Sequence, residues 1–268
     1  MNENAIRREI VEVGKRLFQR DMVAANDGNI SVRVSDTTVL ITPTGVSKGY
    51  MDTQSLLRVN IADGKVLNGN GKASSETPMH LTIYRNRPDV MAVVHAHPPT
   101  ATGFAVAGIA FDDIALPEAV LGLGNVALTD YATPTTNEVA QVVLDKIKCS
   151  DVLLLANHGA VAVGDSLTQA YFRMESLEQV AKITLTARLL GNVNLLNTEQ
   201  QSRLFDLREK MGLRDYCLSC NNCGNCTNPS AVEEHVASQA SSNGVPSEAM
   251  IREIVTRIYT ELSARTPR

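Results

Sequence analysis

The sequence has no tryptophan, few aromatic residues and no long apolar run. Aromatic side chains make up 4% of the 268 residues. Every apolar run is shorter than the ~20 residues that a membrane-spanning helix needs. The charged residues at the N-terminus are not followed by the apolar stretch of a signal peptide. We therefore expect a cytoplasmic protein without a membrane partner.

A surplus of positive charge is also missing. The chain carries 25 Lys and Arg against 29 Asp and Glu, a formal net charge of −4. Nucleic acids and anionic lipid surfaces attract basic proteins, so this balance argues against a nucleic-acid partner. What the chain does contain is 44% apolar residues. They are enough for a sizeable core in one large α/β domain or two smaller domains.

Cysteine is too scarce for a disulfide framework, and four of the five cysteines lie in one short run. The run reads C-x2-C-x2-C-x2-C and consists of Cys217, Cys220, Cys223 and Cys226. Thiolates at this spacing can wrap a soft metal, so the run is a candidate second metal site for Zn²⁺ or an Fe–S cluster. Zinc is favoured, because the last spacing is shorter than in ferredoxins and Thr227 replaces their proline. The alternative is a flexible Asn- and Gly-rich segment that binds no metal.

The spacing of apolar residues predicts a mixture of helices and strands. Helices are predicted over residues 4–25, 78–85, 138–148 and 166–190. Strands are predicted over residues 30–34, 38–41, 57–61, 65–67, 90–95 and 152–156. Asp63-Gly64 joins two of these strands and is a strong hairpin signal. Hairpins mixed with helices favour a layered α/β domain whose sheet is largely antiparallel.

Three of the five histidines follow apolar strands. His95 and His97 lie two residues apart at the end of the predicted strand 90–95, so period-two geometry points both imidazoles to the same face. His158 follows the predicted strand 152–156. Three neutral imidazoles from two strand ends can form an open tetrahedral site for Zn²⁺. The alternative is a set of hydrogen-bonded structural histidines.

Three loops contain residue types that bind anions. Ser74 and Ser75 precede a predicted helix, where unpaired N–H groups and the positive end of the helix dipole favour an anion. Glu76 lies beside them and could act as a metal ligand or as a base. Gly28-Asn29 and Thr44-Gly45 offer close backbone approach together with amide and hydroxyl groups. Each segment also fits an ordinary helix cap or turn, and none matches a P-loop.

Together these segments resemble the class II aldolase/adducin family. The matching motifs are Gly28-Asn29-Ile30-Ser31-Val32-Arg33, Ile41-Thr42-Pro43-Thr44-Gly45, Ser74-Ser75-Glu76 with His80, His95-x-His97-Pro98 and Asn157-His158-Gly159. The resemblance covers residues 1–215. It implies a three-layer α/β/α domain with a largely antiparallel central sheet. It also implies a homotetramer with one Zn²⁺ per subunit, close to a subunit interface.

The resemblance implies a role for each motif. His95, His97 and His158 would bind the zinc ion. Glu76 would ligate the metal in the empty site and act as acid and base once substrate displaces it. The substrate's phosphate would lie in a pocket formed by Gly28, Asn29, Thr44, Gly45, Ser74 and Ser75.

The implied reaction is cleavage of a 1-phosphoketose, L-fuculose 1-phosphate or a close relative, to dihydroxyacetone phosphate and L-lactaldehyde. Zinc would act as a Lewis acid for the enediolate that is left at C3, without a Schiff-base lysine. The same scaffold leaves alternatives: a ribulose-phosphate 4-epimerase, a methylthioribulose-phosphate dehydratase or aldolase, and a non-catalytic adducin-like binding module. The presence of all three histidines and Glu76 argues against the non-catalytic alternative.

One part of the implied active site departs from the resemblance. The tyrosines that the family's fuculose aldolases use near the aldehyde end of the substrate correspond to Leu116 and Met211. Glu118, Tyr131 and Tyr216 are candidates to replace them. The metal and phosphate end of the site is therefore better defined by the sequence than the aldehyde end.

The C-terminal part of the chain differs in composition from the rest. We interpret residues 1–215 as the aldolase domain, 216–228 as a Cys-rich segment, 229–246 as a flexible linker and 247–268 as an amphipathic helix. A linker and a short amphipathic helix resemble the encapsulation peptides of bacterial microcompartments. The helix would then bind shell or cargo proteins, and the enzyme would lie inside a microcompartment. The alternative is a helix packed on its own core or on a tetramer neighbour.

Overall fold

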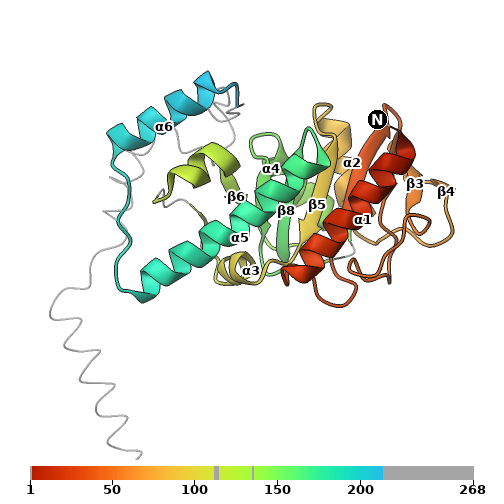
Figure 1. Cartoon of the computed structure of the whole chain (residues 1–268), viewed down its shortest axis with the longest axis horizontal. Helices are drawn as coiled ribbons and strands as arrows, with labels where there is room; N and C mark the ends of the chain where they lie inside the picture. The colour runs from red at the N-terminus through yellow and green to blue at the C-terminus, as the bar shows by residue number, and fades with distance from the viewer. Residues whose placement is uncertain (1, 112–114, 135, 214–268) are drawn as a thin grey trace, which may run out of the picture. The chain divides into compact units, whose positions relative to one another are not determined.

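An eight-stranded sheet forms the centre of the computed structural model, which describes residues 2–111, 115–134 and 136–213 (Figure 1). In space the strands follow the order β4-β3-β2-β1-β5-β8-β7-β6. Their bounds are β1 (Asn29–Ser35), β2 (Thr38–Ile41), β3 (Leu57–Asn60), β4 (Val66–Asn68), β5 (Ala92–Ala96), β6 (Val126–Leu128), β7 (Val152–Leu155) and β8 (Gly159–Gly164). Neighbouring strands are antiparallel except for β6 and β7. The prediction of a largely antiparallel sheet is therefore confirmed.

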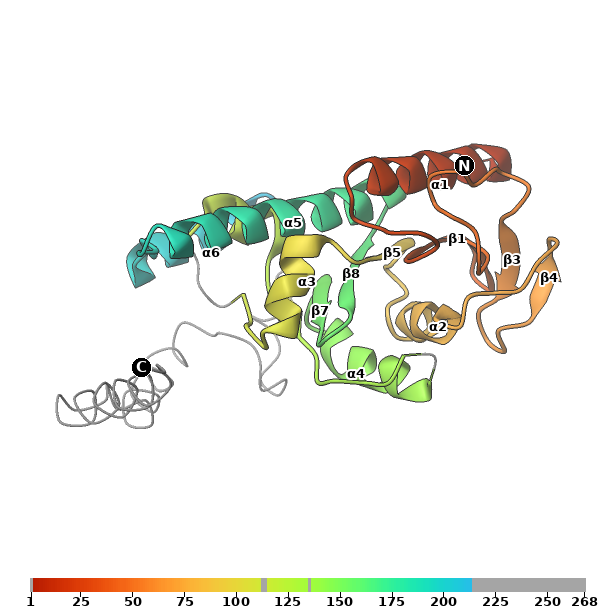
Figure 2. The same cartoon turned by 90° about the horizontal axis from the view of Figure 1, so that it is seen from below.

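Helices cover both faces of this sheet. They are α1 (Glu3–Gln19), α2 (Thr77–Asn86), α3 (Pro99–Val106), α4 (Asn137–Ile147), α5 (Leu167–Leu189), α6 (Thr198–Lys210) and a short π-helical turn, η1 (Ala119–Leu123). Figure 2 shows α1 and α5 on one face and α2 and α4 on the other. The three-layer α/β/α arrangement is thus confirmed. No helix among the residues described combines the length and the apolar character needed to cross a bilayer.

A separate apolar core fills the space on each side of the sheet. Strand β5 contributes to both cores, because successive side chains of a strand point to opposite faces. Val94 joins the core beneath α1 and α5, and Val93 joins the core beside α2 and α4. Strands buried on both faces read as continuous apolar runs. This is why β5 and β7 were recognisable in the sequence.

The first helix is shorter than predicted. Helix α1 ends at Gln19 instead of continuing to residue 25, because Asp21 and Ala25 adopt left-handed backbone conformations with φ of 57° and 44°. Met22 and Val23 lie beyond the helix and are nevertheless buried. Their apolar character therefore reflects the core packing of a loop, and not a further helical turn. This loop leads directly into β1 and the candidate site.

Several elements had no clear signal in the sequence. Strand β8 is a short run of alternating alanine and valine that begins at Gly159 and ends at Gly164. Helix α3 begins at Pro99, immediately after a histidine motif. The predicted linker and terminal helix lie outside the described residues. So do the four cysteines of the C-x2-C-x2-C-x2-C run and Tyr216.

Candidate metal centre

The structure brings the three predicted histidines together at one end of the sheet. The ring centroids of His95, His97 and His158 are 4.9 to 5.0 Å apart. One ring nitrogen from each lies within 4.8 Å of the other two. The sheet topology explains this meeting: β5 and β8 are antiparallel neighbours, and Ala96 pairs with Ala160. The carboxyl end of β5 therefore lies beside the turn that carries His158.

Two glycines allow the backbone to approach the histidines this closely. A Cβ atom on Gly159 would lie 2.5 Å from Cδ2 of His97. A Cβ atom on Gly28 would lie 2.7 Å from the carbonyl oxygen of His95, and Gly28 also has a φ of 69°. Both values are below any normal non-bonded contact, so larger residues would move the histidine-bearing strand. The conspicuous Asp-Gly-Asn and His-Gly sequences thus have a steric reason.

Two of the imidazoles are oriented by groups outside the cluster. Nδ1 of His95 donates to the carbonyl oxygen of Ala160 at 2.9 Å. Nδ1 of His97 faces the Asp27 carboxylate at 3.5 Å. These partners leave Nε2 of both rings pointing into the cluster, where the two atoms are 3.2 Å apart. Metal-binding histidines commonly have such a carbonyl or carboxylate on the other ring nitrogen.

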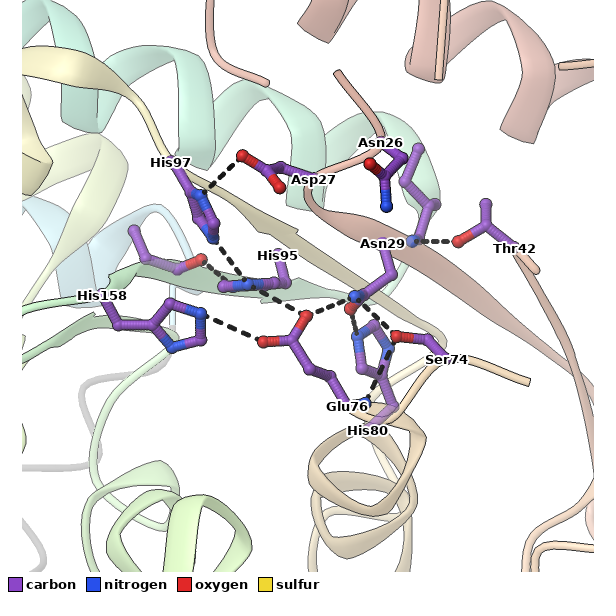
Figure 3. Close-up of polar contacts among 12 residues, drawn as sticks. Asn26, Asp27, Asn29, Thr42, Ser74, Glu76, His80, His95, His97 and His158 are labelled. Atoms are coloured by element: carbon purple, nitrogen blue, oxygen red, sulfur yellow. Dashed lines mark hydrogen bonds and ion pairs between the residues drawn. The ribbon is translucent and has the colours of Figure 1, made fainter. Parts of the chain in front are cut away.

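The carboxylate of Glu76 lies against Nε2 of His95 and Nε2 of His158 (Figure 3). Oε1 is 3.1 Å from Nε2 of His158, and Oε2 is 3.4 Å from Nε2 of His95. Nδ2 of Asn29 donates to Oε2 at 2.6 Å. Burial disfavours ionisation of Glu76, but the imidazoles and the hydrogen bonds outweigh it and hold the pKa of this carboxyl far below its usual range. Glu76 is therefore ionised and can only accept hydrogen bonds.

The protonation of His95 and His97 depends on burial and on neighbouring charges. Burial, together with the neighbouring imidazoles, lowers the pKa of His97 to about 4. Burial also opposes a charge on His95, but the Glu76 carboxylate outweighs it and raises the pKa of His95. His97 is thus neutral at neutral pH, the form in which imidazole binds metals.

These residues fit a zinc ion. Tetrahedral Zn²⁺ takes imidazole nitrogens and carboxylate oxygens at ~2.1 Å, which places two ligand atoms roughly 3.4 Å apart. The 3.2 Å separation of the two Nε2 atoms of His95 and His97 is close to that spacing. The three histidines can therefore hold a metal ion, with Glu76 positioned to supply an oxygen.

The candidate phosphate-binding loops lie next to this cluster. Nδ2 of Asn29 is 3.3 Å from Oγ of Ser74. A β-bridge pairs Pro43 with Ala73, and the Thr44 amide donates to the carbonyl oxygen of Lys72 at 3.0 Å. The segment carrying Thr44 and Gly45 therefore lies beside the segment carrying Ser74 and Ser75. Their role in phosphate binding stays a prediction.

Lys48 is a notable residue that the sequence did not mark. Its side chain is buried, and Nζ donates to the carbonyl oxygens of Asn26 at 2.8 Å and Val46 at 2.9 Å. Burial lowers the pKa of Lys48 to about 8, although the carboxylates of Asp27 and Glu76 act in the opposite direction. Lys48 thus ties the loop before β1 to the loop after β2. A lysine in a turn looks like a surface residue, so no local pattern reveals this contact.

The structure does not assign the aldehyde-end role. Leu116 packs against the core beneath α1 and α5, and Met211 is 58% exposed. Tyr131 is 62% exposed, and Glu118 lies on the surface before η1. Within the described residues no hydrogen bond or ion pair joins Glu118 or Tyr131 to the histidines. The candidates that the sequence offered therefore stay untested.

Comparisons with known proteins identify the family. The family model for the class II aldolase and adducin N-terminal domain matches residues 8–185, and the chain belongs to this family. An L-fuculose phosphate aldolase of Methanococcus vannielii is 39% identical over 177 residues, which are 66% of this chain and 93% of that protein. A 3-oxo-tetronate 4-phosphate decarboxylase of Escherichia coli K12 is 37% identical over 185 residues, 68% of this chain and 86% of that protein. The crystal structure of YgbL from Escherichia coli superposes with a TM-score of 0.70 at 33% identity, covering 77% of this chain and 99% of that one.

Proposed function

We propose that this protein is a zinc-dependent carbon–carbon lyase that releases dihydroxyacetone phosphate from a phosphorylated substrate. The observation that carries the proposal is the position of the Glu76 carboxylate, 3.1 Å from His158 and 3.4 Å from His95. A carboxylate in that position faces both a metal site and the candidate phosphate pocket. The site therefore combines groups for charge stabilisation, proton transfer and anion binding.

His95, His97 and His158 would hold the zinc ion. When bound, zinc supplies Lewis-acid stabilisation of negative charge on substrate oxygens. The protein's own contribution is to keep the three rings oriented. The Ala160 carbonyl group and the Asp27 carboxylate do this for His95 and His97.

Glu76 would transfer the proton that C3 gains. In the cleavage direction the bond between C3 and C4 breaks, its electron pair stays on C3, and the proton of the C4 hydroxyl group is lost as C4 becomes an aldehyde carbon. C3 must then gain a proton to give dihydroxyacetone phosphate. An ionised carboxylate has no proton of its own, so Glu76 would first take up the proton released at C4, directly or through water, and then deliver it to C3. The loops at Asn29 and Ser74 would bind the phosphate and so position C3 against Glu76.

The first proposed substrate is L-fuculose 1-phosphate or a close 1-phosphoketose, with L-lactaldehyde as the second product. Its support is the similarity to an L-fuculose phosphate aldolase and the loops that the sequence suggests for a terminal phosphate. A homotetramer is proposed with it, on the family resemblance. In such an assembly a neighbouring subunit could complete the aldehyde end of the site.

A second candidate reaction is decarboxylation of 3-oxo-tetronate 4-phosphate, which also yields dihydroxyacetone phosphate. Here the bond between C1 and C2 breaks, C1 leaves as CO2, and the electron pair stays on C2, next to the carbonyl carbon. C2 must then gain a proton to give dihydroxyacetone phosphate. No hydroxyl group beside the broken bond has to lose a proton. The specific observation in its favour is that Leu116 and Met211 correspond to the family's aldehyde-end tyrosines. A decarboxylase needs no such tyrosine, and one relative bears that name.

Product analysis tests both reactions in one experiment. The zinc-loaded full chain is incubated separately with L-fuculose 1-phosphate, L-ribulose 5-phosphate and 3-oxo-tetronate 4-phosphate. Dihydroxyacetone phosphate with equimolar lactaldehyde supports the aldolase, and dihydroxyacetone phosphate with equimolar CO2 supports the decarboxylase. Conversion of the 5-phosphate without release of a three-carbon product would instead indicate an epimerase and contradict the proposal.

A further inference from the structure

A chain of buried hydrogen bonds runs from the centre of the sheet to the candidate active site. The Tyr84 hydroxyl group is 2.9 Å from Oγ of Ser31, which is 2.6 Å from Nδ1 of His80. Nε2 of His80 is 2.5 Å from Oδ1 of Asn29, and Nδ2 of Asn29 is 2.6 Å from Glu76. The close-up shows His80 next to Asn29 and Glu76 (Figure 3). The proposed reaction makes no use of three of these residues.

The donors and acceptors of this chain can be assigned in only one way. Nδ2 of Asn29 donates to Oε2 of Glu76, so the carbonyl oxygen of the same amide faces His80. Nε2 of His80 must then carry the hydrogen. Burial keeps His80 neutral by lowering its pKa to about 3, so Nδ1 is a bare acceptor. Ser31 therefore donates to His80, and Tyr84 donates to Ser31.

The chain ends on a hydroxyl group in the candidate phosphate pocket. Oγ of Ser74 accepts a hydrogen bond from Nδ2 of Asn29 at 3.3 Å and another from the backbone N–H of Glu76 at 3.2 Å. Both of its lone pairs are then engaged. Within the described residues no acceptor is placed for the Ser74 hydrogen. The pocket thus presents a donor and has its acceptors already occupied.

We propose that His80 is a positioning residue that fixes the donor polarity of the anion pocket. Its Nε2–H holds the carbonyl oxygen of the Asn29 amide while Glu76 accepts from Nδ2 of the same amide. Through Asn29 it leaves the Ser74 hydroxyl group free to donate to a phosphate oxygen. The pocket is therefore set for an anion before the anion arrives, so little reorganisation accompanies binding. This inference rests on the proposed function, because it assigns the anion to the phosphate of the substrate.

Loss of the Nε2 hydrogen of His80 would weaken the binding of an anion in the pocket. Without it, the Asn29 carbonyl oxygen would lose its donor, and the amide would be held only by the hydrogen bonds of Nδ2 to Glu76 and Ser74. Asn29 and Ser74 would then be less firmly positioned. The pocket would have to be ordered when an anion binds, and the affinity for phosphate would fall.

The main test compares His80→Leu with His80→Gln in the zinc-loaded full chain. Leucine removes both polar atoms, whereas the glutamine amide can again donate toward Asn29 and accept from Ser31. Inorganic phosphate is the probe, titrated calorimetrically, and zinc content is measured in parallel. We expect His80→Leu to weaken phosphate binding by at least roughly tenfold, with most of the loss recovered in His80→Gln. Equal phosphate affinity in wild type and a folded His80→Leu protein would overturn the inference, as would equal losses in both variants.

A spectroscopic measurement covers the case in which His80→Leu does not fold. In wild-type protein with ¹⁵N-labelled histidine, the His80 signals should show the Nε2–H tautomer, unchanged between about pH 6 and pH 9. Ser31→Ala is the matched variant, because it removes the donor to Nδ1 and should perturb those signals. A wild-type Nδ1–H tautomer or a charged ring would overturn the proposal.

The two proposals fail in different ways. If the wild-type protein processes none of the three substrates but binds inorganic phosphate in a His80-dependent manner, the proposed reaction is wrong and the role of His80 stands. If the enzyme is active and phosphate binding does not change in the His80 variants, the proposed reaction stands and the role of His80 is wrong.

Discussion

Strands β5, β7 and β8 carry a cluster of polar residues at each end, an arginine and aspartate cluster at one end and the histidine cluster at the other. Before β5 and β7, Arg87 pairs with Asp89 and Asp151 at 2.8 Å each, and Arg173 pairs with Asp151 at 2.7 Å. Two cations meet two anions, and further N–H groups of Arg87 and Arg173 donate to the carbonyl oxygens of Ile147 and Val163. At this end of the strands, which we call the arginine end, the charged groups are therefore paired with one another.

The histidine end is different, because three imidazoles converge there on one carboxylate. The Nε2 atoms of His95 and His97 face each other at 3.2 Å, and Glu76 lies against Nε2 of both His95 and His158. A cation completes such a set, whereas nothing needs to be added at the arginine end. Buried polar clusters on one sheet can thus be structural or functional, and the difference lies in what each leaves unpaired.

The largest expected effect is loss of a metal ligand at the histidine end. His97→Ala should lose its zinc and reduce turnover by at least about a thousandfold, because metal stabilisation of developing charge is worth several kcal/mol. Metal analysis by mass spectrometry and a product assay check this. Stoichiometric zinc in the variant would contradict the proposed centre.

Replacement of the carboxylate separates metal binding from proton transfer. Glu76→Gln should keep zinc and lose turnover by about 10²- to 10⁴-fold, since the amide has the same shape but cannot carry the proton. The matched control is Glu12→Gln, which changes an exposed glutamate on α1. Normal turnover by Glu76→Gln would remove this residue from the mechanism.

A change at the arginine end should lower stability and leave chemistry intact. Asp151→Asn deprives Arg87 and Arg173 of their shared carboxylate, and breaking a buried ion pair costs about 3–5 kcal/mol. Urea denaturation measures the loss, and the kcat of the folded fraction should match wild type. Asp145→Asn, at an exposed position on α4, serves as the control. A selective fall in kcat would mean that the two ends are not functionally distinct.

Replacement of Lys48, which lies near the histidine end, should have a smaller and pH-dependent effect on the free energy of unfolding. Its folded pKa of about 8 lies below the ordinary lysine value of 10.5, so between these values the unfolded chain binds the extra proton. Stability contributed by this group therefore rises as pH increases through that window, and below it the buried charge is destabilising. Denaturation curves of wild type and Lys48→Met at about pH 7.5 and 10 should show the relative stability of wild type increasing. A constant difference would disprove the shift.

The smallest effect on catalysis is expected from residues that belong to neither end. Deletion of residues 229–268 should leave kcat/KM within about twofold of wild type. If these residues form the targeting segment suggested by their sequence, they should carry a fused fluorescent protein to microcompartments in cells. Loss of folding on deletion would show a structural role instead.

Most elements of the fold were predictable because they depend on local pattern. The apolar runs of β5 and β7 and the spacing of α4 and α5 are properties of adjacent residues. The motifs of the candidate site were visible for the same reason. The predicted end of α1 was wrong, because the buried residues Met22 and Val23 continue the apolar pattern after the helix has ended.

The amino-acid sequence by itself determined the kinds of groups available: imidazoles two apart at a strand end, a carboxylate at the start of a helix, and serines beside it. Only the tertiary structure decided which of them meet. His80 contacts Asn29 across 51 positions, and Lys48 reaches Asn26 from a different loop. These contacts depend on β1 lying between β2 and β5. Strand order and register arise from the packing of the whole sheet, which local periodicity does not encode.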